Sequence, residues 1–214
     1  MPDVAIAEDN PETGKYELKW AVEVSLTKTY AALKDDMELL LKGYSHVRQC
    51  ALVKITETHD YAPPPPMTDE EIAEHGLKDA LTIQDDDFSG EGYGPIRYGN
   101  KVWAGIKEIF WETWELDPAT DEPVQVGERQ FIYPISSESQ PQPEISLNQI
   151  LSIRAETLVP PWDIFRDHLQ PRLKGWARFR YIRWYWETRG EYADKSWGNE
   201  EGPVTKKRKL ESNE

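Results

Sequence analysis

The chain is poor in cysteine and has no long hydrophobic run, and each absence excludes a class of protein. Its 214 residues include one cysteine, Cys50, which cannot form a disulfide within the chain, so a reducing compartment is expected. Cys50 lies in the apolar run CALVKI, where a small core residue is expected rather than a nucleophile. No apolar stretch is long enough to span a bilayer, and the start MPDVAIAEDN lacks the basic and apolar parts of a signal peptide. We therefore expect neither a disulfide scaffold nor a membrane protein.

Positive charge is also scarce. The chain has 25 Lys and Arg against 39 Asp and Glu, which gives a formal net charge of -14 at pH 7. Taken as a whole, this charge argues against a general nucleic-acid binder, because it would repel phosphate groups. The charge is uneven, however. Residues 69–91 contain nine acidic residues and one base, whereas residues 172–183 contain five bases and no acid.

Residues 1–60 have the pattern of a compact α/β unit. A short strand is expected at 2–7, and a second strand at 18–26, where apolar side chains alternate. An apolar stripe at helical spacing predicts a helix from about Thr29 to about Lys42, which is followed by an apolar strand at 48–56. The order strand, helix, strand favours a right-handed crossover and parallel pairing of the two strands that it connects.

An acidic, Pro-rich insertion is expected at residues 61–95. The run APPPP cannot lie inside a helix or a central strand. Thr68 is the expected N-cap of a short helix, with Glu71 at the capping-box position. The stretch QDDDFSGEGYGP that follows is predicted to be a mobile, solvated loop rather than a calcium site.

Residues 96–150 predict an aromatic β-hairpin, and the chain then becomes helical. The tryptophans of the hairpin are expected to pack rather than to form a ligand cage; they are Trp103, Trp111 and Trp114. A helix is expected after Pro161, broken by Pro171 and resuming to about Tyr192. Residues 193–214 lack periodicity and predict a disordered tail. The sequence therefore predicts a single α/β domain over residues 1–192.

Glu23 is the most informative single residue, because it lies in the middle of the apolar strand WAVEVSL. A buried carboxylate is costly unless a cation or a hydrogen-bond donor meets it. If the strand that carries Asp3 pairs with this one, the two carboxylates can approach within a few ångströms. They would then repel each other unless a divalent cation lay between them, and Mg²⁺ prefers such oxygen ligands. Lys28 could point back from the next turn and steady a metal-bound water or a phosphate oxygen.

A purely structural interpretation of the same residues is open as well. Glu23 would then form an ion pair with Lys28, or with Arg48 or Lys54 on the neighbouring strand, and Asp3 would be a solvated terminal residue. Buried ion pairs perturb carboxylates just as functional sites do.

The pattern PDVAI … WAVEVSLTKTYAALKDDMELLL … VRQCALVKI resembles the PD-(D/E)XK, or restriction-endonuclease-like, superfamily. More closely, it is similar to a set of uncharacterised fungal proteins. In these a PD strand is followed by an hhhEVxxSQS strand, a helix with an Asp-rich surface and an apolar strand. They often continue with a Pro-rich segment and an E-x-W-x-x-D hairpin, which WETWELDPATDEP matches. The resemblance covers about residues 1–150 and implies a mixed sheet with a crossover helix.

The resemblance also implies a chemistry. In the superfamily the Asp and the Glu bind Mg²⁺ and a lysine assists hydrolysis of a phosphodiester, so the implied metal ligands here are Asp3 and Glu23. The usual lysine, two residues after the Glu, is replaced by Ser25. Lys28, where the fungal set tends to have glutamine, is the candidate for its role. The superfamily core normally has a helix and a strand before the PD strand, so the sequence predicts either a fragment or an incomplete core.

Two basic segments suggest partners. The first alternates with aromatic residues and consists of Arg172, Lys174, Arg178, Arg180 and Arg183. These side chains could contact phosphates beside stacked bases, or they could balance the acidic segment while their stems pack. The second, KKRKL in the tail, contains Lys206, Lys207, Arg208 and Lys209 and suits a nuclear-import receptor. It favours the nucleus over the cytoplasm.

The sequence thus predicts a restriction-endonuclease-like α/β domain with an aromatic β-hairpin and a C-terminal helical extension. The predicted function is that of a nuclease-like nuclear protein, with Mg²⁺-dependent hydrolysis of nucleic-acid phosphodiesters. The alternative is a catalytically inactive descendant that serves as a nuclear protein- or nucleic-acid-interaction module. Convergence of Asp3, Glu23 and Lys28 in space would favour the first hypothesis.

Overall fold

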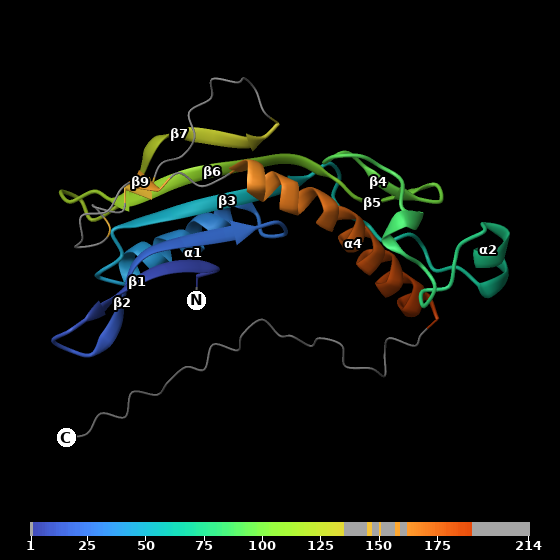
Figure 1. Ribbon diagram of the computed structural model, residues 1–214, viewed down its shortest axis with the longest axis horizontal. Coiled ribbons are helices and arrows are strands. Elements are labelled where there is room, and N and C mark those ends of the chain that lie inside the picture. Colours follow the sequence, from blue (N-terminus) through green and yellow to red (C-terminus); the bar gives the residue numbers. More distant parts are fainter. Residues whose placement is uncertain (1, 135–144, 147–149, 151–156, 159–161, 190–214) are drawn as a thin grey trace.

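A five-stranded mixed sheet forms the centre of the molecule (Figure 1). The computed structural model describes residues 2–134, 145–146, 150, 157–158 and 162–189. The strand order is β1-β2-β3-β6-β7. The strands are β1 (Val4–Asn10), β2 (Lys15–Ser25), β3 (Gln49–Glu57), β6 (Ile106–Leu116) and β7 (Pro123–Tyr133). β2 and β3 pair in parallel, as predicted, and the other neighbouring pairs of this sheet are antiparallel.

Helix α1 (Tyr30–Gly43) connects β2 to β3 and packs on one face of the sheet. Thr29 is its N-cap, since the Thr29 hydroxyl accepts a hydrogen bond from the Ala32 amide at 3.2 Å. The predicted apolar stripe is buried through Leu33, Met37, Leu40 and Leu41, and each such side chain contributes about 1.5–3 kcal/mol. Cys50 lies in this core, where burial and the charge of Glu23 raise the pKa of its thiol to about 12.

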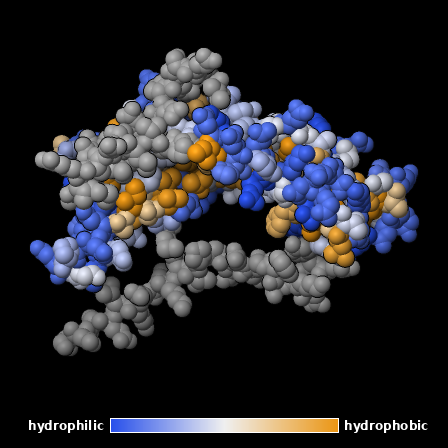
Figure 2. Space-filling view, in the orientation of Figure 1, coloured by the Kyte–Doolittle hydropathy of each residue, from blue (hydrophilic) through white to orange (hydrophobic). Residues whose placement is uncertain are grey.

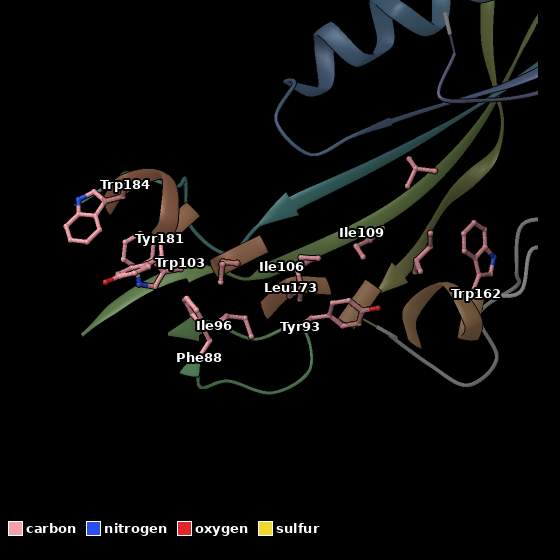
Figure 3. Close-up of a cluster of buried hydrophobic side chains, with 14 of the residues drawn as sticks. Phe88, Tyr93, Ile96, Trp103, Ile106, Ile109, Trp162, Leu173, Tyr181 and Trp184 are labelled. Atoms are coloured by element: carbon pink, nitrogen blue, oxygen red, sulfur yellow. The ribbon is translucent and has the colours of Figure 1, made fainter. Parts of the chain in front are cut away.

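Helix α4 (Trp162–Thr188) packs on the opposite face, where Leu173, Tyr181 and Trp184 join the main hydrophobic core (Figure 3). The prediction that Pro171 breaks this helix was wrong, because α4 runs through it. A proline inside a helix removes one backbone hydrogen bond and costs about 3 kcal/mol. Buried side chains on both sides of Pro171, including Trp162 and Leu173, outweigh that cost.

The acidic insertion folds against the C-terminal half of α4. It contains α2 (Asp69–Glu74) and the 3₁₀ turn η1 (Asp85–Asp87), and a small hairpin of β4 (Ile96–Tyr98) and β5 (Lys101–Ala104) follows it. The capping box of Thr68 and Glu71 is present, as predicted. The stretch after Gln84 was expected to be a solvated loop, but Phe88 is buried and packs against Tyr98 and Tyr181. The sequence did not indicate that Phe88 is buried, because acidic residues lie on both sides of it.

The predicted aromatic hairpin is divided in the structure, because β5 pairs with β4 in a separate small sheet and β6 pairs with β7 in the main sheet. Its aromatic residues supply both cores. Trp103, Trp111 and Trp114 are all buried, which confirms that they pack. β6 alternates its faces, so Trp111 joins the α4 side and Trp114 joins the α1 side. β8 (Ile145–Ser146) pairs with β9 (Thr157–Leu158) in a separate two-stranded ladder. Among the described residues, no helix is both long enough and apolar enough to cross a membrane.

Candidate functional site

Asp3 and Glu23 are brought together at the edge of the sheet. The Asp3 amide donates to the Val22 carbonyl at 3.1 Å, and the Asp3 carboxylate accepts the Val24 amide at 2.7 Å. Glu23 lies between Val22 and Val24 on β2, so Asp3 lies directly beside Glu23. The Glu23 side chain is only 7 % exposed, whereas Asp3 remains exposed. The two hydrogen bonds extend the β1–β2 ladder and hold Asp3 in place, although it is close to the start of the chain.

The surroundings of Glu23 are acidic. Burial raises the pKa of the Glu23 carboxyl, and the neighbouring Asp3 raises it further. Lys28 lowers this pKa and Asp36, on α1, raises it. A carboxyl in such a place holds its proton more tightly than usual unless a cation arrives.

The ion pairs that a structural role would require are not made by Glu23. Lys54 instead donates to the backbone carbonyls of Leu26 and Ile55, at 2.8 and 3.0 Å. Burial lowers the pKa of the Lys54 ammonium. Within the described part of the chain, no ion pair joins Glu23 to Lys28, Arg48 or Lys54. The ion pairs expected from a purely structural role of Glu23 are therefore not formed among the described residues.

Lys28 reaches the same place from the turn between β2 and α1. Its ammonium lies 2.5 Å from an Asp36 carboxylate oxygen. The hydrogen bond to Asp36 raises the pKa of Lys28, and the charges of Glu23 and Asp3 raise it as well. Ser25, which stands where the superfamily has its lysine, accepts the Lys28 amide at 2.9 Å and so fixes this turn. Asp3 and Glu23 therefore lie together, and Lys28 lies at the turn that follows them with its ammonium on Asp36.

Asp36 is a fourth charged residue beside Asp3, Glu23 and Lys28. It was not among the site residues predicted from the sequence. It lies off the apolar stripe of α1, eight residues after Lys28, with Asp35 beside it. That position on the polar face of a helix was visible in the sequence. Its pairing with Lys28 was not visible, because it depends on how the turn folds back over the helix start.

The donor set of this constellation consists of carboxylate oxygens, which suits a hard cation such as Mg²⁺. Asp3 and Glu23 fit such an ion, since Glu23 is a nearly buried carboxylate that no donor in the described residues neutralises. Mg²⁺ needs only one or two protein carboxylates, because it retains waters and takes phosphate oxygens. Across the described ranges, no group of three or more His, Cys, Asp or Glu side chains is arranged to hold a metal ion.

A second buried carboxylate, Glu112 on β6, was missed by the sequence analysis. It is 1 % exposed and accepts three hydrogen bonds: from the Tyr30 hydroxyl at 2.8 Å, the Trp114 indole at 3.1 Å and the Arg129 guanidinium at 2.8 Å. A register shift between β6 and β7 accompanies Gly127 at φ 74°, and the exposed Arg129 reaches Glu112 from this irregular part of β7. The Arg129 guanidinium also lies 3.7 Å from the Phe110 ring centroid. Glu112 is thus fully compensated.

The five predicted nucleic-acid contacts divide into two groups. Arg180 is nearly buried and pairs with Glu57 at 2.6 Å, while Arg178 and Arg183 face Asp85 and Glu187 at 3.6 and 2.7 Å. Arg178 thus faces the acidic segment, as the alternative expected, whereas Glu57 and Glu187 lie outside that segment. Arg172 and Lys174 form no ion pair within the described residues, and each lines a cavity beside α4. The import cluster Lys206, Lys207, Arg208 and Lys209 lies outside the described residues.

Comparison of the chain with protein-family models, with curated proteins and with solved structures gave no match.

Proposed function

We propose that the protein is a nuclease-like enzyme that hydrolyses nucleic-acid phosphodiesters with Mg²⁺. The single observation that carries this proposal is that Asp3 is held on β2 beside the nearly buried Glu23, with Lys28 at the turn that follows. The hairpin of β1 and β2, the crossover helix and the parallel strand β3 follow the order that the PD-(D/E)XK resemblance implies. The coarse fold is compatible with many functions, so the side chains carry the argument.

Each residue has a role that its surroundings support. Asp3 and Glu23 would hold Mg²⁺, which when bound polarises a phosphoryl oxygen and favours deprotonation of a water. Asp3, held by the Val24 amide, presents its carboxylate to solvent at a fixed place. Lys28 supplies a positive charge that can stabilise the developing negative charge on phosphate oxygens. For this, the Lys28 ammonium must exchange Asp36 for the substrate.

A cleavage assay tests this proposal directly. Fluorescently labelled DNA and RNA, single-stranded and duplex, would be incubated with the full chain in Mg²⁺ and in EDTA. We expect cleavage only with Mg²⁺. The Glu23→Gln variant should be slower by about a hundredfold or more, the cost of removing a group that stabilises transition-state charge. Glu115→Gln is the matched control, because Glu115 is exposed on β6.

The outcome separates the two hypotheses. Cleavage that survives Glu23→Gln, or that persists in EDTA, would contradict this site. Absence of cleavage, with nucleic acid still bound, would support the inactive interaction module instead. In either case the folding of each variant would be checked by circular dichroism.

We also propose that the tail directs the protein to the nucleus. Residues 196–214 fused to an inert cargo should accumulate in nuclei through the cluster Lys206, Lys207, Arg208 and Lys209. Changing these four residues to alanine should abolish the accumulation, which fluorescence microscopy measures. Unchanged accumulation would show that these four residues do not direct the protein to the nucleus.

A further inference from the structure

A small apolar cavity of about 200 Å³ lies beside α4 at the ends of β2 and β3. Leu26, Ile55 and Ile106 line it from the sheet side. Leu169, Leu173 and Trp176 line it from α4, where their spacing puts them on one face of the helix. Hydrophobic side chains line the hollow between this end of the sheet and α4 (Figure 2). A cavity of about 150 Å³ lined by apolar side chains is known to hold one benzene ring, so this cavity suits a single planar base.

Arg172 contributes its apolar stem to the cavity wall, and its guanidinium is not part of the lining. It is exposed, lines the cavity and forms no ion pair in the described part of the chain. By contrast, Arg178, Arg180 and Arg183 on the same helix each face a carboxylate. In a chain with a net charge of -14, an unpaired guanidinium beside an apolar cavity fits a ligand with an anionic group next to an aromatic ring.

Trp176 adds an aromatic wall. The Arg180 guanidinium stacks 3.9 Å from the Trp176 ring centroid, and the Glu57 carboxylate holds Arg180 in turn. These contacts hold the indole as a rigid wall of the cavity. Stacking of a base on such a ring is tolerant of sequence, because every base has a π-face.

The cavity lies near the same end of β2 as the candidate site, but on the opposite side of the sheet, which faces α4. Leu26 comes three residues after Glu23, about 10 Å along an extended chain. The Lys54 ammonium holds the Leu26 carbonyl at 2.8 Å, which fixes the wall of the cavity relative to the end of β2. A strand that occupies both places would pass around the end of β2, where Leu26 and Lys28 lie.

We infer that this cavity binds one unpaired nucleobase of the strand whose phosphodiester lies at the candidate site, with Arg172 on a phosphate of that strand. The inference depends on the proposed function and defines its substrate class. A base must leave its stack to enter a cavity of this size, which costs least in a single strand or a frayed end. The preferred substrate is therefore single-stranded nucleic acid rather than intact duplex.

Binding measured in EDTA tests this inference without requiring catalysis. Fluorescence anisotropy would compare a labelled single-stranded DNA, the same strand with abasic sites throughout, and a blunt duplex. We expect the intact strand to bind about tenfold or more tightly than the other two, which corresponds to one stacked base. Leu169→Trp, which fills the cavity, should remove this preference. Ile164→Trp adds the same ring at an exposed position of α4 and should not.

Arg172 is tested by salt dependence. Arg172→Gln should reduce the slope of log affinity against log salt by about 0.7, the value for one phosphate contact on a single strand. Arg183→Gln removes the same charge elsewhere on α4 and should leave the slope nearly unchanged. The inference is overturned if no strand binds, if the abasic strand binds as well as the intact one, or if Leu169→Trp binds like the wild type. If cleavage continues in those cases, only this inference about the cavity fails and the proposed nuclease function is still supported. Base-dependent binding without cleavage would support the cavity inference and contradict the nuclease function.

Discussion

Glu23 and Glu112 occupy the same rung of the sheet, on either side of Leu52, and face the same helix. Both residues are buried. Glu112 accepts hydrogen bonds from Tyr30, Trp114 and Arg129. For Glu23, burial and then the charge of Asp3 raise the pKa of the carboxyl, whereas the charge of Lys28 lowers it.

This difference distinguishes two uses of a buried carboxylate. Three donors satisfy Glu112, so its charge specifies how α1, β6 and β7 fit together. Ionisation of Glu23 is unfavourable at this position, and a glutamine of the same shape would not have this free-energy cost. Perturbed carboxylates of this second kind cluster at functional sites. Four predictions test the contrast.

The largest expected effect comes from removing the cation beside Glu112. Arg129→Leu should lower the free energy of unfolding by about 3–5 kcal/mol, because it leaves a buried charge without its partner. Urea titration followed by tryptophan fluorescence measures this loss. In the double variant Arg129→Leu with Glu112→Gln the loss should be smaller than with Arg129→Leu alone. Additive losses would show that the pair is not coupled.

Tyr30→Phe should have a smaller effect on the same network. It removes one hydrogen bond to a charged group, and we expect a loss of about 1.5–3 kcal/mol. Tyr16→Phe is the control, since the Tyr16 ring is exposed and its change should cost almost nothing. Equal values for the two variants in urea titrations would mean that Tyr30 does not support Glu112.

Magnesium should act on Glu23 and not on Glu112. At ten times its dissociation constant, Mg²⁺ should stabilise the wild type by about 1.4 kcal/mol, or about 3–5 °C in melting temperature. Glu23→Gln should show no such shift in differential scanning fluorimetry. A wild type indifferent to Mg²⁺, together with a strongly destabilised Glu23→Gln, would remove the metal site.

The smallest effect is a pH dependence with a defined sign. The folded state raises the pKa of Glu23 above its ordinary value of 4.5, so the folded protein binds this proton more tightly than the unfolded chain. The contribution of Glu23 to stability is therefore greatest below pH 4.5 and falls as the pH rises through the folded pKa. In metal-free buffer, the melting temperature of the wild type minus that of Glu23→Gln should decrease from pH 4.5 to pH 7. An increase would mean that Glu23 has a favourable partner.

Local sequence signals were sufficient for much of the fold. Thr68 was identified as an N-cap, the start of α1 was predicted at about Thr29, and the parallel pairing of β2 with β3 followed from the order of elements. Such signals depend on neighbours within a few residues, which is why they could be used without a structure. Pro171 shows where they fail, because packing on both sides of it overrides a local rule.

The sequence by itself determined the α/β pattern, the buried stripe of α1 and the presence of an ionisable residue, Glu23, in an apolar strand. Only the tertiary structure decided what surrounds each charge. Tyr30 reaches Glu112 across 82 residues of chain and Arg180 reaches Glu57 across 123. The spacing of apolar residues predicts which side chains are buried, because one face of a helix or strand packs on the core. It does not report which partner meets a buried charge, because that depends on contacts between distant segments.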